Sequence, residues 1–231
     1  MQKPQEIYFF GTCLIDLLYP QAGLAGMQLI REAGVDVIFP RNQTCCGQPA
    51  FNSGYRHEAL DVARALLGCF PRDIPLVVPS GSCAGMMRHH YPTLFDDHPD
   101  RPEALALSER VFELTEFLVH VLRLQLQDLG QPTRVALHAS CSARREMGVA
   151  KDHKSLLRQL KQVELVEPER SEECCGFGGT FAVKHPHVWG AMVQDKADAI
   201  VRCGADRLIS GDCGCLMNIG GQLEHRGNHL P

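Results

Sequence analysis

The stretch NQTCCGQPAFNSG, residues 42–54, contains two adjacent cysteines followed by a glycine, and EECCGFGGTF, residues 172–181, contains the same pattern. Two thiols on neighbouring residues are badly placed to close a disulfide with each other, and both are prone to oxidation. A chain that carries such a pair twice therefore has another use for these thiols, and the positions of the other cysteines indicate that use.

The eleven cysteines form two sets that are related by a nearly constant offset. Five positions of the first half recur 128 to 134 residues later: Cys13 with Cys141, Cys45 with Cys174, Cys46 with Cys175, Cys69 with Cys203, and Cys83 with Cys215. The flanking residues agree as well, because FFGTC resembles LHASC and ARALLGC resembles ADAIVRC in its small and apolar positions. The chain is therefore an internal duplication with a period close to half of its 231 residues.

Each half alternates short apolar runs with segments of helical periodicity. We predict strands at EIYFF, VDVIFP and PLVVPS in the first half, and at RVALH, VELVEP and DRLIS in the second. Strands that alternate with helices predict parallel βαβ units. We therefore expect an α/β fold of two pseudo-symmetric repeats, each a small parallel sheet of βαβ units. The first repeat would span residues 1–106, a connecting helix 107–130, and the second repeat 131–231.

Most of the cysteines directly follow a predicted strand. The carboxyl ends of parallel strands meet at one edge of a sheet, so the cysteines of one half should converge there. The predicted ligand sets are Cys13, Cys45, Cys46 and Cys83, and Cys141, Cys174, Cys175 and Cys215, with Cys213 as a further candidate of the second set. Cys69 and Cys203 instead end helices, near the opposite edge, and we interpret them as buried structural thiols.

Four thiols from three strand ends indicate a metal site, which could hold zinc or an iron–sulfur cluster. Structural zinc sites usually use compact Cys-x-x-Cys knuckles, and this sequence contains none. Adjacent thiolates fit one tetrahedral ion poorly but can bind two metals of a larger cluster. Gly47 and Gly176 would leave backbone N–H groups free to face the cluster sulfurs. Two iron–sulfur clusters, as [4Fe–4S], are favoured, with zinc as the alternative.

The order of cysteine, about thirty residues, CCG, about thirty-five residues and cysteine resembles the cysteine-rich CCG domain. This iron–sulfur domain occurs in duplicate in heterodisulfide reductases, in the glycolate oxidase iron–sulfur subunit and in lactate-utilisation protein A. The segments VPSGSCAGMMRHHYP and CLMNIGG resemble the last of these families most. The full pattern ends in Cys-x-x-Cys, but here Met86 and Asn218 stand three residues after Cys83 and Cys215. Four thiolates suffice for a [4Fe–4S] cluster. The missing fifth thiolate puts noncubane chemistry in doubt, and the choice between cubane and noncubane clusters stays open.

The resemblance implies an iron–sulfur electron-transfer subunit of a system that oxidises L-lactate to pyruvate, within an oxidoreductase complex of the L-lactate dehydrogenase type. Its implied partners are a ferredoxin-like iron–sulfur subunit and a third small subunit of a lactate-utilisation complex. Two alternatives stay open. One is a zinc-binding structural subunit, and the other is a thiol–disulfide enzyme like heterodisulfide reductase.

Composition argues against nucleic-acid and membrane binding. The formal charge is −4 and the basic residues are scattered, so no basic stripe for nucleic acid is expected. No apolar run reaches the eighteen or so residues of a membrane span, and the N-terminus lacks the apolar core of a signal peptide. We expect a cytoplasmic protein without a membrane span.

Several basic residues lie close to the predicted ligands in sequence. Arg88, Arg144 and Arg145 could stabilise an anionic cluster or simply be surface residues. The candidate proton carriers or ligands among the histidines are His89, His90, His138, His185 and His187. We interpret His138 as a hydrogen-bonded core histidine, because it lies within the strand before Cys141.

Overall fold

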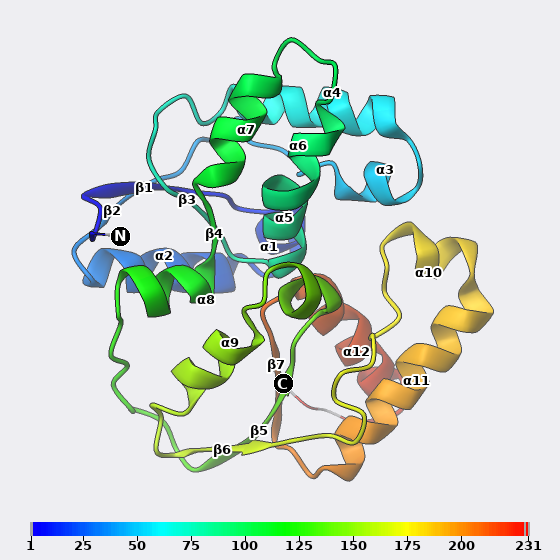
Figure 1. Cartoon of the computed structure of the whole chain (residues 1–231). Coiled ribbons are helices and arrows are strands. Elements are labelled where there is room, and N and C mark those ends of the chain that lie inside the picture. Colours follow the sequence, from blue (N-terminus) through cyan, green and yellow to red (C-terminus); the bar gives the residue numbers. More distant parts are fainter. Residues whose placement is uncertain (1, 229, 231) are drawn as a thin grey trace. The chain divides into compact units, whose positions relative to one another are not determined.

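The computed structural model describes residues 2–228 and residue 230, and the chain divides into two compact units. The first unit ends at Leu124 and the second begins at Gln125. Each unit is built on its own parallel sheet with helices between the strands (Figure 1). The α/β class with two repeats, predicted from the duplicated cysteines, is therefore confirmed.

In the described part of the first unit, four parallel strands lie in the order β2-β1-β3-β4. The strands are β1 (Glu6–Phe9), β2 (Asp36–Ile38), β3 (Leu76–Val78) and β4 (Val111–Glu113). The helices are α1 (Cys13–Leu18), α2 (Pro20–Glu32), α3 (Gln48–Asn52), α4 (Arg56–Leu67), α5 (Gly81–Gly85), η1 (Met86–His90), α6 (Tyr91–Leu94), α7 (Arg101–Glu109), α8 (Leu114–Glu116) and η2 (Phe117–Val121). The central strand β3 is buried and apolar throughout, and β1 is buried after Glu6, as parallel strands covered on both faces should be.

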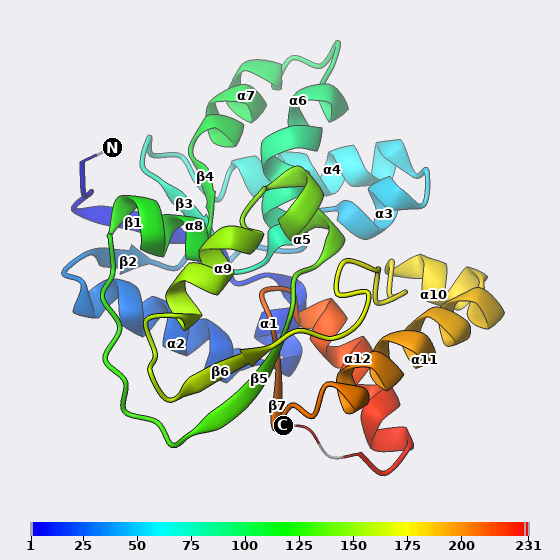
Figure 2. The same ribbon diagram turned by 60° about the horizontal axis from the view of Figure 1, so that its bottom comes forward.

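In the described part of the second unit, three parallel strands lie in the order β6-β5-β7. The strands are β5 (Thr133–His138), β6 (Val163–Val166) and β7 (Arg207–Ser210). The helices are η3 (Ser142–Glu146), α9 (Ala150–Leu157), α10 (Thr180–Lys184), α11 (Pro186–Arg202) and α12 (Cys213–His225). Helices α11 and α12 lie side by side in both views (Figures 1 and 2). They pack Ile200 and Ile219 in one core cluster with Ala136 and Leu208 of the sheet.

The two sheets share their first three strands in the same spatial order. In each, the first strand of the unit lies between the second and the third. The register is parallel throughout, for example Tyr8 opposite Leu76 and Leu137 opposite Ile209. This order brings the carboxyl end of the first strand, which precedes Cys13 or Cys141, between the loops that carry the other cysteines of its unit.

The segment between the repeats differs from the predicted helix over residues 107–130. Helix α7 ends at Glu109, β4 follows, and the short α8 and η2 end at Val121; residues 123–129, all described, form neither helix nor strand. The prediction of one helix was wrong because Val111 and Phe112 are strand-forming residues that extend the sheet beside β3. The side chain of Glu113 then caps the next helix in a capping box with Glu116.

The longest helix of the described residues is α11, with 17 residues. Neither it nor any other helix in that part of the chain is long and apolar enough to cross a membrane.

Candidate cysteine sites

The first cysteine site begins where β1 ends. Cys13 is the first residue of α1, and the Thr12 side chain accepts a hydrogen bond from the backbone N–H of Ile15 at 3.3 Å, which caps this helix. The Gln43 side chain accepts from the N–H of Gly11 at 3.1 Å and donates to Phe9 O at 3.4 Å. These bonds attach the loop after β1 to the loop that carries Cys45 and Cys46.

The four cysteines of the first unit lie in contact as a row. The Sγ atoms of Cys13 and Cys45 are 3.9 Å apart, and those of Cys46 and Cys83 are 3.4 Å apart. The pKa of Cys45 is lowered by both Cys13 and Cys46, so Cys45 interacts with a thiol of each pair. Cys83 lies in the first turn of α5, which Ser80 caps. The fold therefore brings together the four thiols that the spacing predicted for this unit.

The turn after the first cysteine pair depends on Gly47. Its φ of +84° is in the left-handed region, and a Cβ atom there would lie 3.1 Å from Ala59 O on α4. The buried Tyr91 hydroxyl donates a hydrogen bond of 2.9 Å to Cys46 O. Helix packing and a side chain from α6 thus fix the backbone on which Cys45 and Cys46 stand.

The second cysteine site repeats this construction. Ser140 occupies the position of Thr12, and its hydroxyl accepts from the N–H of Ala143 at 3.1 Å. Ser140 also donates to the buried carboxylate of Asp212, the residue that precedes α12. The loop after β5 is therefore tied to the loop after β7, whereas in the first unit Gln43 ties it to the CCG loop.

The second set of thiols is also in contact. The Sγ atoms of Cys175 and Cys215 are 3.2 Å apart, and side-chain hydrogen bonds link Cys174 to Cys141 and to Cys175. The backbone N–H of Gly176 donates to Cys174 Sγ at 3.3 Å, as expected for an N–H that faces a sulfur ligand. Cys213, the further candidate, is the partly exposed first residue of α12.

Gly176 is confined more tightly than its counterpart. Its φ is +88°, and a Cβ atom there would lie 2.9 Å from Met192 Cβ and 3.2 Å from Trp189 O, both on α11. Such distances are too short for a side chain without movement of the helix. The glycine after each cysteine pair is thus required both by backbone conformation and by the close approach of a helix.

The positions of the two missing fifth cysteines hold residues with other roles. Met86 is fully buried in η1. Asn218 donates from Nδ2 to Cys175 O at 2.8 Å and accepts from Trp189 Nε1 at 2.7 Å. In the second unit, therefore, an amide supports the CCG loop at the position where the full pattern has a thiol. The sequence shows the missing cysteine but gives no signal of this bond.

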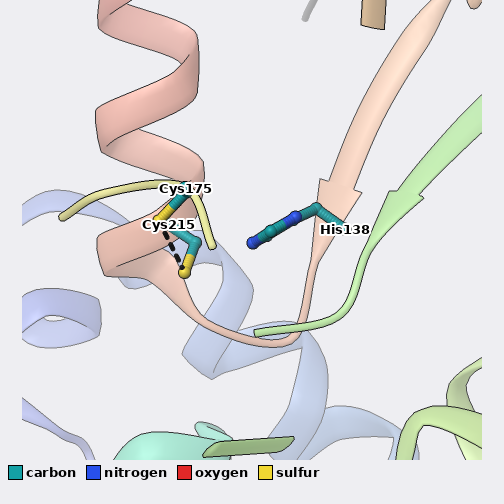
Figure 3. Close-up of side chains that lie close together, drawn as sticks. All are labelled: His138, Cys175 and Cys215. Atoms are coloured by element: carbon teal, nitrogen blue, oxygen red, sulfur yellow. Dashed lines mark hydrogen bonds between the residues drawn. The ribbon is translucent and has the colours of Figure 1, made fainter. Parts of the chain in front are cut away.

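His138 lies beside the second cysteine site. A ring nitrogen of His138 and the Sγ atoms of Cys175 and Cys215 lie within 4.8 Å of one another, and the imidazole points toward the two sulfurs (Figure 3). The side chain is buried, and its Nε2 has no hydrogen-bond partner among the described residues. Burial and then the charge of Lys196 lower the pKa of His138 to about 4, so the ring is neutral near pH 7.

We predicted that His138 is a hydrogen-bonded core histidine. It is buried, but its Nε2 is not hydrogen-bonded within the described part of the chain, so this part of the prediction is wrong. Its counterpart in the duplication is Phe10, which is fully buried. The signal was present in the sequence, because LHASC places a polar residue where FFGTC has an apolar one. A difference between the repeats at a buried position beside a ligand marks a functional candidate.

The thiols of each site differ widely in pKa. Hydrogen bonds from Cys13 and Cys46 lower the pKa of Cys45 to about 3. The hydrogen bond with Cys45 raises the pKa of Cys46 well above its ordinary value, and burial adds to this effect. The second unit has the same order, with the pKa of Cys174 lowered by Cys141 and Cys175.

One thiolate thus forms readily in each site, and further thiolates are opposed. Four thiolates in one site need positive charge close by, which iron or zinc would supply. The pKa of Cys141 is raised by its hydrogen bond with Cys174, and the charge of the exposed Arg145 opposes this rise. Of Arg88, Arg144 and Arg145, it is therefore Arg145 whose charge acts on the thiol of Cys141.

The spacing of the sulfurs helps to distinguish a single ion from a cluster. Tetrahedral zinc with Zn–S bonds of about 2.3 Å needs every pair of sulfur ligands about 3.8 Å apart. Among the described residues, three metal-binding atoms lie within 4.8 Å of one another only in the group of His138, Cys175 and Cys215. The row of thiols in the first unit is therefore more open than one ion requires, whereas the second unit groups three metal-binding atoms more closely.

The other basic candidates have structural partners. Arg88 forms a two-point ion pair with Glu116, with distances of 2.7 and 3.1 Å, and donates to Val111 O. Arg144 donates to Glu172 O. His90 stacks near Phe51, with ring centroids 5.0 Å apart. His89, His185 and His187 are exposed.

The two cysteines outside the predicted ligand sets bond to backbone carbonyls. Cys69 is buried, and its Sγ donates to Ala65 O at 3.5 Å and to Asn42 O at 3.6 Å. Cys203 is half-buried and donates to Ile200 O at 3.0 Å. Both contacts are those of packed helix-terminal thiols.

Comparison with known protein families agrees with the duplicated geometry. The model of the cysteine-rich domain named CCG matches twice, over residues 7–88 and 135–220. The chain belongs to the CCG cysteine-rich domain family. It is 43% identical over 228 residues to lactate utilization protein A of Geobacillus sp. (strain WCH70), covering 97% of this chain and 94% of that protein. It is 40% identical over 228 residues to the protein of the same name from Bacillus subtilis (strain 168), with the same coverage.

A solved structure has a similar fold. The crystal structure of a hypothetical protein from Helicobacter pylori superposes with a TM-score of 0.64 at 14% sequence identity. The match covers 98% of this chain and 45% of the other. At this identity the likeness concerns the fold alone.

Proposed function

We propose that this chain is an iron–sulfur electron-transfer subunit of an L-lactate oxidation system, with one [4Fe–4S] cluster in each unit. The observation that carries the proposal is the convergence of four thiols on equivalent loops of both repeats. The relatives named lactate utilization protein A, which match over nearly their full length, support the substrate.

The residues that would hold the clusters come from three loops of each sheet. They are Cys13, Cys45, Cys46 and Cys83 in the first unit, and Cys141, Cys174, Cys175 and Cys215 in the second. When bound, such clusters accept and release single electrons. The chain's own part is to present the thiols, to direct the N–H of Gly176 at Cys174, and to hold both CCG loops rigid through Gly47 and Gly176.

The oxidation of lactate to pyruvate releases two electrons and two protons, and two one-electron sites in one chain match this number. The electrons need a further carrier, so we propose a ferredoxin-like iron–sulfur subunit and a third small subunit as partners, in the cytoplasm. Co-purification of the tagged chain from its native host tests this part. Recovery of the chain without an iron–sulfur partner would contradict it.

The decisive experiment is iron, sulfide and zinc analysis of the full chain made and purified without oxygen. We expect a brown protein with about eight iron and eight sulfide per chain, and an electron paramagnetic resonance (EPR) signal on reduction. Colourless protein with stoichiometric zinc would instead support the structural alternative. Turnover of a mixed disulfide by the isolated chain would support the heterodisulfide-reductase-like alternative.

A further inference from the structure

The second cysteine site contains one more metal-binding group than the first. Both units bring four cysteines together, but among the described residues only the second unit places a buried imidazole against them. At the equivalent position of the first unit, the fully buried Phe10 packs its ring against Phe70, with centroids 6.2 Å apart. The two residues occupy equivalent positions at the carboxyl end of the first strand of each unit, Phe10 directly after β1 and His138 as the last residue of β5.

The geometry of His138 is that of a ligand. A ring nitrogen and the sulfurs of Cys175 and Cys215 lie within 4.8 Å of one another, and the tip of the ring faces the sulfurs (Figure 3). Bonds of about 2.0 Å to nitrogen and 2.3 Å to sulfur place the two atoms at most about 4.3 Å apart on one metal, so the group is close to the spacing that a shared metal needs. Among the described residues, no other three metal-binding atoms are grouped so closely.

The surroundings of His138 leave its Nε2 for this purpose. The side chain is 3% exposed, and Nε2 has no hydrogen-bond partner in the described part of the chain. Buried polar atoms are nearly always paired, so one without a partner indicates a missing bonding group. The backbone of His138 is fixed, because β5 pairs it with Ser210 of β7. This pairing fixes the point from which the imidazole extends toward the sulfurs.

The second unit also lacks the cysteine that would provide a fifth donor in the full pattern. Asn218 stands there, and its amide is occupied by Cys175 O at 2.8 Å and by Trp189 Nε1 at 2.7 Å. Any fifth donor must therefore come from another residue. His138 at the end of β5 is the group that faces Cys175 and Cys215.

We propose that Nε2 of His138 binds an iron of the second cluster, as a fifth donor beside Cys175 and Cys215. The second site is then a mixed histidine–cysteine site, and the first is an all-cysteine site. This inference rests on the proposed function, because it requires a cluster at the second site. It is the lone pair of the imidazole that forms the bond, and no electron is transferred in forming it.

The test is pulsed EPR of the reduced full chain, made without oxygen and labelled with ¹⁵N-histidine. We expect the strong hyperfine coupling of a directly bound nitrogen in one of the two cluster signals. The variant Cys46→Ser should keep this coupling, since it disturbs only the first site, and Cys175→Ser should remove it. A wild-type spectrum with cluster signals but only weak nitrogen coupling overturns the proposal, whatever the variants do.

Substitutions of His138 test whether its imidazole is the source of the strong nitrogen coupling. His138→Phe gives the second unit the residue of the first, and it should abolish the strong coupling and shift the reduction potential of one cluster only. His138→Gln is the second variant if the first fails to fold. His187→Gln, at an exposed position, is the matched control and should change neither property. Strong coupling that persists in His138→Phe overturns the proposal. Protein without iron overturns the proposed function itself, which is a distinguishable result.

Discussion

The two cysteine sites have the same backbone plan but different supporting side chains. In both, a hydroxyl residue caps the segment after the first cysteine, and a left-handed glycine follows the cysteine pair. The carbonyl of the second cysteine of the pair, however, is bound by Tyr91 from α6 in the first unit and by Asn218 from α12 in the second. His138 replaces Phe10 beside the thiols.

Some features that bring the thiols together are the same in both units, and others differ. The strand order, the cap and the glycine place the sulfurs, and all three are present twice. The residues behind the sulfurs decide charge, hydrogen bonding and additional donors, and these differ. The duplicated units have therefore kept the arrangement of the thiols, while the side chains around the thiols became different.

The largest expected effect is on cofactor content. Cys46→Ser should empty the first site and Cys175→Ser the second, since each removes a buried thiol in contact with another ligand. The iron content of each variant should fall from about eight to about four atoms per chain. Cys69→Ser and Cys203→Ser are matched controls that should keep all the iron. If Cys46→Ser emptied both sites, the units would not be independent metal sites.

The next effect concerns the turns after the cysteine pairs. Gly47→Ala and Gly176→Ala should each lower the free energy of unfolding by about 1–3 kcal/mol, because alanine is strained at positive φ. Gly176→Ala should cost more, since its Cβ would meet Met192 Cβ at 2.9 Å, against 3.1 Å to Ala59 O for Gly47.

Denaturant midpoints under anaerobic conditions measure this difference. Gly220→Ala is the control. It lies within α12, its Cβ would meet nothing within 4 Å, and alanine should raise stability by about 1 kcal/mol. A stabilising effect of Gly176→Ala would show that the turn does not need its glycine.

A third effect compares the bonds that support the CCG loops. Asn218→Ala leaves both Cys175 O and Trp189 Nε1 without their partner, and Tyr91→Phe leaves only Cys46 O. Unpaired buried groups cost about 1–3 kcal/mol each, so Asn218→Ala should destabilise the protein more than Tyr91→Phe. Chemical unfolding followed by far-ultraviolet circular dichroism tests the order, and equal midpoints would contradict it.

The smallest effect is that of an exposed ion pair. Hydrogen bonds from Lys154 and then Ser171 lower the pKa of Glu167 below its ordinary value. A lowered folded pKa means that the pair stabilises the protein above the unfolded carboxyl pKa and is lost as the pH falls through the folded one. Because Glu167 is exposed, Glu167→Gln should cost a few tenths of a kcal/mol at pH 7 and nothing at low pH.

The ion pair Lys154–Glu167 of the second unit can be compared with the pair Arg88–Glu116 of the first unit, in which both side chains are about one-fifth exposed. Glu116→Gln should cost more than Glu167→Gln at pH 7, because it also disturbs the capping box of α8. Unfolding midpoints at pH 7 and pH 3 measure both variants. A pH-independent cost of Glu167→Gln would contradict the assignment to its charge.

Much of the fold follows from the sequence because apolar runs and cysteines occur twice in the same order. Strand alternation predicted two parallel sheets, and the rule that loops gather at the carboxyl edge predicted which thiols would meet. The segment from Val111 to Glu113 was mistaken for part of one helix, because its apolar residues suit a helix as well as a strand. Only pairing with β3, a contact distant in sequence, decides between them.

The details of the sites were less accessible from the sequence. Whether Nε2 of His138 finds a partner depends on every side chain around it, which no local pattern records. The ion pair that occupies Arg88 comes from Glu116, 28 residues away, and so the arginine could not be assigned to the fold in advance. Asn218 showed that a cysteine was absent, but its two hydrogen bonds depend on the packing of α11 against α12.

The boundary at Leu124 has a consequence for the order of events during synthesis. Domains fold as units while the chain leaves the ribosome, the N-terminal one first. By the time residue 125 is added, all four cysteines of the first unit and the whole sheet that positions them have been made. The first unit can therefore fold before the second has been translated.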